Sequence, residues 1–248
     1  MGFLRASTRF AAFVFVTIAL YLIWWSFSFF IPNKLYWRQF IFRLWTRIYA
    51  VLAGLRIEII GTPPRPPFFL VCNHLSYTDI AVIRAVVNGV FVAKRDIRNW
   101  PVIGRLVSDM GIVFIDRSNR RDIPRAGAQI VERLDAGEGV IVFPEGTSSK
   151  GEAVLPFNSS FLEFAARTDL PVYYAALSYR TAPGDPPPSA TLCWWDETSF
   201  MRHLFRHFSL RGYTAVLTFG ETPIANPDRK LLARELHTKV SERFIPVI

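Results

Sequence analysis

The chain of 248 residues is long enough for one catalytic domain of ordinary size and a short extra segment. Hydrophobic residues make up 51% of it and aromatic residues 15%, which is high for a freely soluble protein and predicts that one segment or face meets lipid. The formal charge of +9 fits an anionic membrane or an acidic substrate. Because the sequence has no patterning typical of nucleic-acid-binding motifs, nucleic acid is not an expected partner. The two distant cysteines, Cys72 and Cys193, favour a reducing, cytosolic environment over a disulfide framework.

The N-terminal segment Phe10–Ile31 contains no charged residue. At ~1.5 Å per residue, a helix of about 22 residues reaches ~33 Å, enough to cross a hydrocarbon core of ~30 Å. A cleaved signal peptide would have a shorter apolar core of ~7–15 residues and a cleavage site of small residues. The segment therefore predicts a membrane-anchoring helix, which either spans the bilayer or dips into one leaflet.

A second helix is predicted over Asn33–Gly54, where cationic side chains are mixed with Trp and Tyr. This composition suits a helix in the membrane interface, and an ordinary helix packed on the core is an equal alternative. The basic residues that follow the first helix outnumber Arg5 and Arg9 before it; they are Lys34, Arg38, Arg43 and Arg47. Because the more basic flank stays cytoplasmic, we expect residues 1–54 to form a membrane-associated helical pair and residues 55–248 to form a catalytic domain on the cytoplasmic face.

After Gly54 the pattern changes to short apolar, β-branched runs separated by helical segments. Several runs are continuous rather than alternating, as in strands covered on both faces. The predicted strands are Leu55–Ile60, Phe68–Cys72, Val90–Ala93, Ile112–Ile115, Val140–Phe143, Val172–Ser178, Ala190–Trp194 and Tyr213–Phe219. The predicted helices between and after them are Tyr77–Asn88, Pro124–Ala136, Asn158–Arg167 and Asp228–Phe244. This alternation predicts one α/β domain with a largely parallel mixed sheet flanked by helices.

The segment 73–79, NHLSYTD, follows a predicted strand and opens a predicted helix. Two side chains five residues apart on one continuous helix lie ~140° apart, so His74 and Asp79 can meet only if His74 precedes the helix. A cap from Ser76 would start the helix at that point. A carboxylate bonded to one ring nitrogen leaves the other nitrogen free to accept a proton, which makes His74 a candidate general base. The alternative is that Ser76 and Asp79 form a capping box and nothing more.

Two further segments also follow buried strands: 111–117, GIVFIDR, and 143–149, FPEGTSS. In an open α/β sheet, ligands gather at the edge where the strands end. Arg117 is suited to bind a phosphate or a carboxylate with its planar guanidinium. Gly146 permits unusual backbone angles, and Glu145 and Thr147 would line the same edge. The alternatives are a solvated Asp–Arg pair at a strand end and a simple turn.

Together, in this order and spacing, the three segments resemble the glycerolipid acyltransferase family, the PlsC-like lysophosphatidic acid acyltransferases, over roughly residues 35–225. The family's blocks are N-H-x-x-x-x-D, G-x-x-F-I-x-R and F-P-E-G-T, and its later Pro block is matched by 170–172, LPV. The resemblance implies an α/β fold with an N-terminal membrane-associated helical pair, and acyl transfer from acyl-CoA or acyl carrier protein to a lysolipid. It also implies that His74 is the base, that Asp79 orients it, and that Arg117, Glu145 and Gly146 help to bind the acceptor head group.

One position departs from the family pattern. Many members carry Arg after F-P-E-G-T, where this chain has Ser148, so one cationic phosphate contact is missing. Lysophosphatidic acid is an expected acceptor if Arg117, Lys94 or Lys150 supplies the charge. A lysolipid without a terminal phosphate, such as lyso-ornithine lipid, is the alternative. An acyl-CoA thioesterase and a non-catalytic lipid-binding protein are more remote alternatives.

The expected reaction needs no cofactor. His74 would accept the proton of the acceptor hydroxyl as its oxygen attacks the thioester carbonyl, while backbone N–H groups near Gly146 stabilise the oxyanion. A thiolate leaves readily, so neither a metal nor a covalent enzyme intermediate is required. Cys72 is expected to be a small core residue rather than a nucleophile. His203 and His207 lack the Glu and the third ligand of a helix-borne zinc site.

Overall fold

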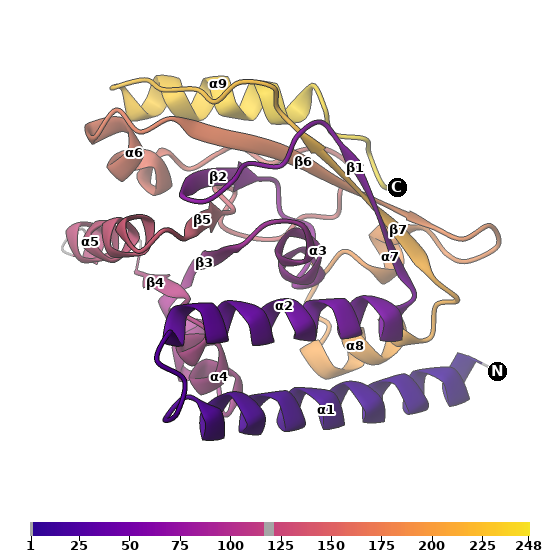
Figure 1. Cartoon of the computed structure of the whole chain (residues 1–248). Helices are drawn as coiled ribbons and strands as arrows, with labels where there is room; N and C mark the ends of the chain where they lie inside the picture. The colour runs from indigo at the N-terminus through magenta and orange to yellow at the C-terminus, as the bar shows by residue number, and fades with distance from the viewer. Residues whose placement is uncertain (1, 117–121) are drawn as a thin grey trace.

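The fold is that of a computed structural model, which describes residues 2–116 and 122–248. Across these two ranges, seven strands form one mixed sheet in the order β1-β7-β6-β2-β5-β3-β4 (Figure 1). Neighbouring strands are parallel except β6 and β7, which are antiparallel. The strands are β1 (Leu55–Ile60), β2 (Phe68–Cys72), β3 (Gly89–Lys94), β4 (Val113–Ile115), β5 (Gly139–Val142), β6 (Val172–Thr181) and β7 (Tyr213–Phe219). The predicted α/β class and the largely parallel mixed sheet are confirmed.

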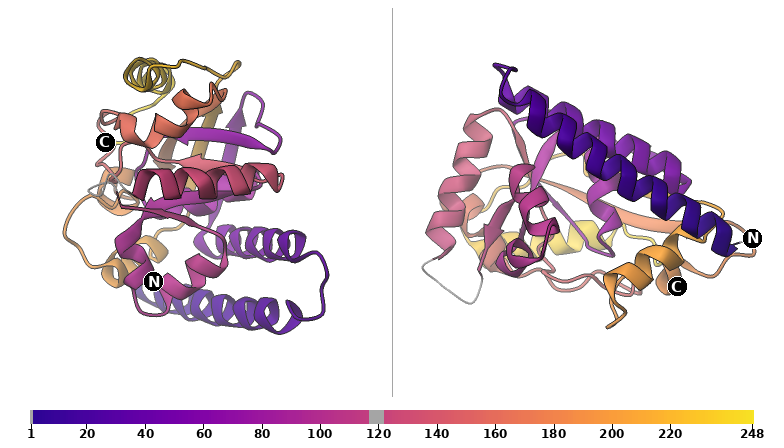
Figure 2. Two further views of the ribbon diagram at one scale, coloured as in Figure 1. Left: turned by 90° about the vertical axis from the view of Figure 1, so that its left-hand side faces the viewer. Right: turned by 90° about the horizontal axis from the view of Figure 1, so that it is seen from below.

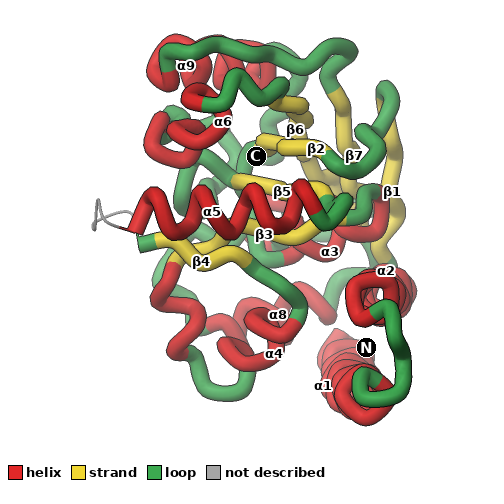
Figure 3. Tube along the Cα trace, turned by 60° about the vertical axis from the view of Figure 1, so that its left-hand side comes forward, coloured by secondary structure: helices red, strands yellow, loops and turns green. Residues whose placement is uncertain are grey.

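Helices cover both faces of the sheet, as Figures 1 and 3 show. The helices on one face are α1 (Gly2–Phe27), α2 (Lys34–Ala53), α3 (Thr78–Val86) and α8 (Phe200–Phe208). Those on the other are α5 (Asp122–Asp135), the 3₁₀ turn η2 (Ser159–Leu162) with α6 (Glu163–Arg167), and α9 (Arg229–Ser241). Shorter helical segments are η1 (Arg95–Asn99), α4 (Ile103–Asp109) and α7 (Pro188–Thr191).

Strand β2 shows why the central runs are continuously apolar. Leu70 and Cys72 pack into the core beneath α2 and α3, whereas Phe69 and Val71 pack into the second core beneath α5, α6 and α9. All five residues of the strand are buried. A central strand that contributes to two cores cannot alternate apolar and polar residues, which is the pattern that the sequence shows.

The helical pair α1 and α2 forms an antiparallel hairpin beside the domain (Figures 1 and 2). Helix α1 begins at Gly2, earlier than predicted, so Arg5 lies inside the helix and donates to the backbone carbonyl of Ser209 at 2.6 Å. Helix α2 buries Phe42 and Tyr49 in the core, which confirms its core-packed face. Helix α1 is long and apolar enough to cross a membrane by length and composition alone.

One predicted strand is wrong. The run Ala190–Trp194 is not a strand, because the short helix α7 begins at Pro188 and ends at Thr191. Proline is favoured in the first turn of a helix, and the hydroxyl of Thr191 donates back to the carbonyl of Pro187 at 3.0 Å. The Pro-rich stretch before this run therefore starts a helix, and this local preference prevails over the strand preference of the apolar residues that follow.

Candidate active site

The polar segments singled out in the sequence follow strands that run in parallel, so they meet at one edge of the sheet. His74 follows β2, Glu145 follows β5, and Lys94 is the last residue of β3. Strand β5 pairs in parallel with both β2 and β3. This edge, where the strands end, is where ligands bind in open α/β sheets.

His74 and Asp79 form the predicted pair. Nδ1 of His74 lies 2.8 Å from Oδ2 of Asp79, and the side chains are 21% and 0% exposed, respectively. Because the carboxylate only accepts, Nδ1 carries the ring proton and donates it to Asp79. In the two described ranges, Nε2 of His74 makes no hydrogen bond, so this nitrogen is available as a proton acceptor.

The carboxylate of Asp79 also holds the loop that carries His74. Its Oδ2 accepts from the backbone N–H of Leu75 at 2.7 Å and of Ser76 at 3.0 Å. Asp79 therefore makes its own half of the predicted capping box, through the N–H of Ser76, and also orients the imidazole. The predicted cap from Ser76 is wrong. The residue at the N-cap is Tyr77, and the buried hydroxyl of Ser76 has no partner in the part of the chain that the structure describes.

Two residues that the sequence analysis missed complete the support of this pair. The hydroxyl of Tyr179 on β6 donates to Oδ1 of Asp79 at 2.6 Å. The ring of Phe143 at the end of β5 stacks on His74, with 4.1 Å between centroids and 13° between planes. Tyr179 is separated from Asp79 by 100 residues, so no local sequence pattern predicts their contact. Phe143 is the last residue of the predicted strand Val140–Phe143 and the first of the FPEGTSS segment, and neither feature predicts a ring stacked on His74.

Asn73 fixes the end of β2 against β6. Its side-chain amide donates to the carbonyl of Leu177 at 2.9 Å, and its carbonyl oxygen accepts from the N–H of the same residue at 2.7 Å. Asn73 is buried, so these two bonds satisfy polar groups that water cannot reach. The residue before His74 thus sets where the imidazole leaves the sheet.

Glu145 is buried and contacts the backbone of His74 rather than solvent. One carboxylate oxygen accepts from the backbone N–H of His74 at 2.8 Å, and the other accepts from that of Leu155 at 3.2 Å. Burial raises the pKa of Glu145 to about 8, although the two N–H donors oppose the shift. Gly146 has a φ of 71°, a left-handed conformation that favours glycine, and its N–H donates to the carbonyl of Phe143 at 3.0 Å.

The remaining predicted head-group residues lie around the rim of this edge. Thr147 and Lys94 are exposed. The hydroxyl of Ser148 donates to the carbonyl of Trp194, so this side chain is turned toward the protein. Lys150 pairs with Glu152 at 2.6 Å. Arg117 falls outside the described residues.

Cys72, His203 and His207, the other side chains with reactive groups in the sequence, are held in the core. Cys72 is buried, and burial raises the pKa of its thiol well above the usual value. The Nε2–H of His203 donates to the carbonyl of Cys193 at 3.1 Å, and its Nδ1 accepts from the hydroxyl of Tyr77 at 3.0 Å. His207 is buried as well and contacts the hydroxyl of Tyr49. These bonds explain both histidines as core residues.

Comparisons with known proteins identify the family of the chain. A family model described as Acyltransferase matches residues 56–178. A lyso-ornithine lipid O-acyltransferase of Brucella abortus is 31% identical over 224 residues, which are 85% of this chain and 84% of the relative. A 1-acyl-sn-glycerol-3-phosphate acyltransferase of Neisseria meningitidis is 37% identical over 134 residues, 52% of each protein.

Among solved structures, the crystal structure of the 1-acyl-sn-glycerophosphate acyltransferase PlsC from Thermotoga maritima has the same fold. It superposes with a TM-score of 0.61, covers 94% of this chain and 97% of its own, and is 22% identical. The shared fold alone does not assign a family, whereas the similarity in sequence to the relatives above does. The chain belongs to the acyltransferase family and is an acyltransferase.

Proposed function

We propose that the protein transfers a fatty acyl group from a thioester donor to the free hydroxyl of a lysolipid, with His74 as general base. The observation that carries this proposal is the 2.8 Å contact between Nδ1 of His74 and Asp79, at the edge where β2 and β5 end. Nε2 takes the proton of the hydroxyl as its oxygen bonds to the thioester carbonyl carbon. The tetrahedral intermediate then collapses, the carbon–sulfur bond breaks, and the imidazolium returns a proton to the leaving thiolate.

The oxyanion of that intermediate needs hydrogen-bond donors. We assign this role to the turn that follows β5, because Gly146 reverses the chain there with a φ of 71°. The N–H of Gly146 itself already donates to Phe143, so the donors come from the residues after it, Thr147 and Ser148. No metal and no covalent enzyme intermediate enters this scheme, since a thiolate is a good leaving group.

The acceptor falls into one of two classes. For the first class, lysophosphatidic acid, the cation that would meet the phosphate is Lys94, which is exposed at the end of β3. The position that carries Arg in many family members is Ser148 here, and its hydroxyl donates to the carbonyl of Trp194. Because this position bears no cation, it favours the second class, a lysolipid without a terminal phosphate. The similarity to a lyso-ornithine lipid O-acyltransferase over 84% of that relative supports the same class.

We infer that residues 1–54 bind the membrane through the outer face of α1 and leave the domain 55–248 on the cytoplasmic side. On this face Phe15, Ile18 and Leu22 are 73%, 55% and 54% exposed. Arg5 and Arg9 of α1 donate to the backbone carbonyls of Ser209 and Leu210, so a bilayer-crossing α1 would have to break these contacts. We therefore favour insertion into one leaflet.

The membrane proposal is tested with Phe15→Glu, which places a charge in the exposed face of α1. Binding to vesicles of anionic phospholipid, measured by flotation, should fall, since a charge in hydrocarbon costs about 2–4 kcal/mol. The matched control is Leu231→Glu on α9, which is 48% exposed on the opposite face of the sheet and should bind like the wild type. Equal flotation of both variants would contradict the assignment of this face.

The acyltransferase proposal is tested by incubating the purified protein with labelled acyl-CoA or acyl carrier protein and a panel of lysolipids. We expect a labelled diacyl product with lyso-ornithine lipid, with lysophosphatidic acid, or with both. Release of free fatty acid in the absence of every acceptor would instead identify a thioesterase. Lipid binding without any acyl transfer would identify a catalytically silent protein.

A further inference from the structure

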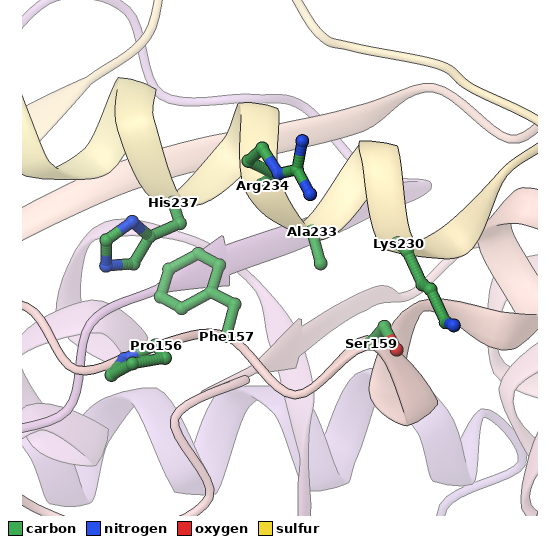
Figure 4. A pocket seen from close by; sticks show the side chains of 7 residues that line it. All are labelled: Pro156, Phe157, Ser159, Lys230, Ala233, Arg234 and His237. Carbon is green, nitrogen blue, oxygen red and sulfur yellow. The ribbon is translucent and has the colours of Figure 1, made fainter.

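A groove of about 390 Å³ lies between α9 and the segment that follows residues 143–147, the turn after β5 that we call the catalytic turn (Figure 4). One wall is formed by residues of the 156–159 segment and the other by one face of α9. The side chains that matter here are Pro156, Phe157 and Ser159 from the segment and Lys230, Arg234 and His237 from the helix. The groove thus combines an apolar ring, a hydroxyl and two exposed cations.

The two cations of the groove, Lys230 and Arg234, differ from the other basic residues of α9. Arg229 pairs with Glu163, and Lys239 pairs with Glu242. No carboxylate pairs with Lys230 or Arg234 in residues 2–116 and 122–248. The two lie four residues apart, so they project from the same face of the helix. Among the described residues, the groove therefore presents two cations without a carboxylate at ion-pair distance, although the N-cap carboxylate of Asp228 is close enough to Lys230 for the two charges to attract.

The groove is connected to the catalytic base through Glu145. Its carboxylate contacts the N–H of His74 at 2.8 Å and that of Leu155 at 3.2 Å, and Pro156 is the next residue along the chain. The N–H of Asn158 donates to the carbonyl of Pro144 at 2.8 Å. The segment that lines the groove therefore begins and ends at the catalytic turn, although the imidazole of His74 is not part of the groove.

The position of the groove separates it from the membrane face. Helix α9 covers the face of the sheet opposite to α1 and α2, as Figure 1 shows. A ligand in this groove approaches from water, whereas the lysolipid arrives from the side of the hairpin. Of the two substrates of the proposed reaction, the thioester donor is the one with a water-soluble, anionic portion.

We propose that this groove binds the phosphate groups of coenzyme A when acyl-CoA is the donor. The volume lies in the range of small-molecule sites, ~300–1,000 Å³. Lys230 and Arg234 pair with phosphate oxygens, and Ser159 donates a further hydrogen bond. The inference rests on the proposed use of a thioester donor and adds the site that recognises its carrier.

The test is the double variant Lys230→Ala/Arg234→Ala, compared with Arg56→Ala as a matched control. Arg56 is an exposed cation on the edge strand β1, remote from the groove. We expect the Kd for coenzyme A, measured by calorimetry on the full-length protein in detergent, to rise about fivefold to thirtyfold in the double variant, because the two lost exposed ion pairs together contribute about 1–2 kcal/mol. The control should match the wild type.

Kinetics supply the second readout. The KM for acyl-CoA should rise by a similar factor in the double variant, and the KM for an acyl N-acetylcysteamine thioester, which has no phosphate, should not change. Unchanged binding of coenzyme A, or equal changes with both thioesters, would overturn the proposal. An effect confined to acyl carrier protein would overturn it in favour of a protein partner. If no donor supports acyl transfer by the wild type, the proposed function fails, while the binding measurement still decides the groove.

Discussion

Two imidazoles flank the start of α3, and they are held in opposite ways. Among the described residues His74 is hydrogen-bonded through Nδ1, to Asp79, and not through Nε2, and its side chain is 21% exposed at the sheet edge. His203 is buried, with Nδ1 bonded to Tyr77 and Nε2 bonded to Cys193. Burial lowers the pKa of His203 to about 4, so this ring stays neutral at neutral pH. Within residues 2–116 and 122–248, Nε2 of His74 has no hydrogen-bond partner, whereas both ring nitrogens of His203 have one.

The difference shows what separates a reactive histidine from a structural one in this protein. Both rings are oriented by hydrogen bonds and both contact the 74–79 segment, so neither a fixed ring orientation nor a place beside this segment distinguishes them. A general base needs one nitrogen fixed and the other accessible, and only His74 of the two meets that condition. The following variants are chosen to separate the two roles.

The largest effect is expected for His74→Ala. Removing the base should lower kcat by about 10³-fold, within the range that general base catalysis contributes. The ring is partly exposed, so the fold should persist, which circular dichroism and thermal unfolding would verify. A folded variant with unchanged acyl transfer would show that another group takes the proton.

The next largest effect is expected for Asp79→Asn. An amide in place of the carboxylate can present its NH₂ to Nδ1, which favours the tautomer with the proton on the wrong nitrogen. We expect kcat to fall about 10²-fold or more. Because Asp79 also accepts from the N–H groups of Leu75 and Ser76, the thermal midpoint should drop as well. A normal kcat in this variant would show that Asp79 acts only as a cap of helix α3.

A smaller effect is expected for Tyr179→Phe, which deletes the donor to Oδ1 of Asp79 and keeps the ring. Loss of one hydrogen bond to a charged group, about 1.5 kcal/mol, corresponds to about a tenfold fall in kcat. If Tyr179 positions the carboxylate, the pH–rate profile should shift together with kcat. A variant that loses only thermal stability would assign Tyr179 a purely structural role.

His203→Gln should reverse the pattern seen at His74. We expect kcat per folded molecule to be unchanged. The free energy of unfolding should fall by about 1–2 kcal/mol, because the hydroxyl of Tyr77 and the carbonyl of Cys193 lose their hydrogen bonds to the imidazole. The lowered pKa of His203 stabilises the wild type above pH ~6.5, and this contribution is lost as the pH falls toward 4. Denaturant unfolding at several pH values would show a weaker acid dependence in the variant. A large fall in kcat would instead place His203 in the reaction.

The sequence predicted those features that are local or periodic. The bounds of β1, β2 and β7 agree with the predicted runs, because buried strands are marked by uninterrupted apolar residues. The His74–Asp79 contact follows from a five-residue spacing across a loop. Tyr179 could not be found in this way, since its contact with Asp79 depends on β6 lying beside β2. Lys94, Thr147 and Arg117 remain predicted substrate contacts.

The smallest expected effect concerns Glu145, which supports His74 from below without touching its ring. Its pKa of about 8 in the folded protein lies above the ordinary value of 4.5, so the fold binds this proton more tightly than the unfolded chain does. The resulting stabilisation is complete below pH ~4.5 and is lost as the pH rises through about 8. Glu145→Gln keeps a carbonyl acceptor for one N–H and has no proton to lose. The free energy of unfolding of the variant relative to the wild type should therefore increase from pH 6 to pH 9, as measured by denaturant titration. A difference that is constant over this range would mean that Glu145 is ionised throughout, held so by the N–H groups of His74 and Leu155.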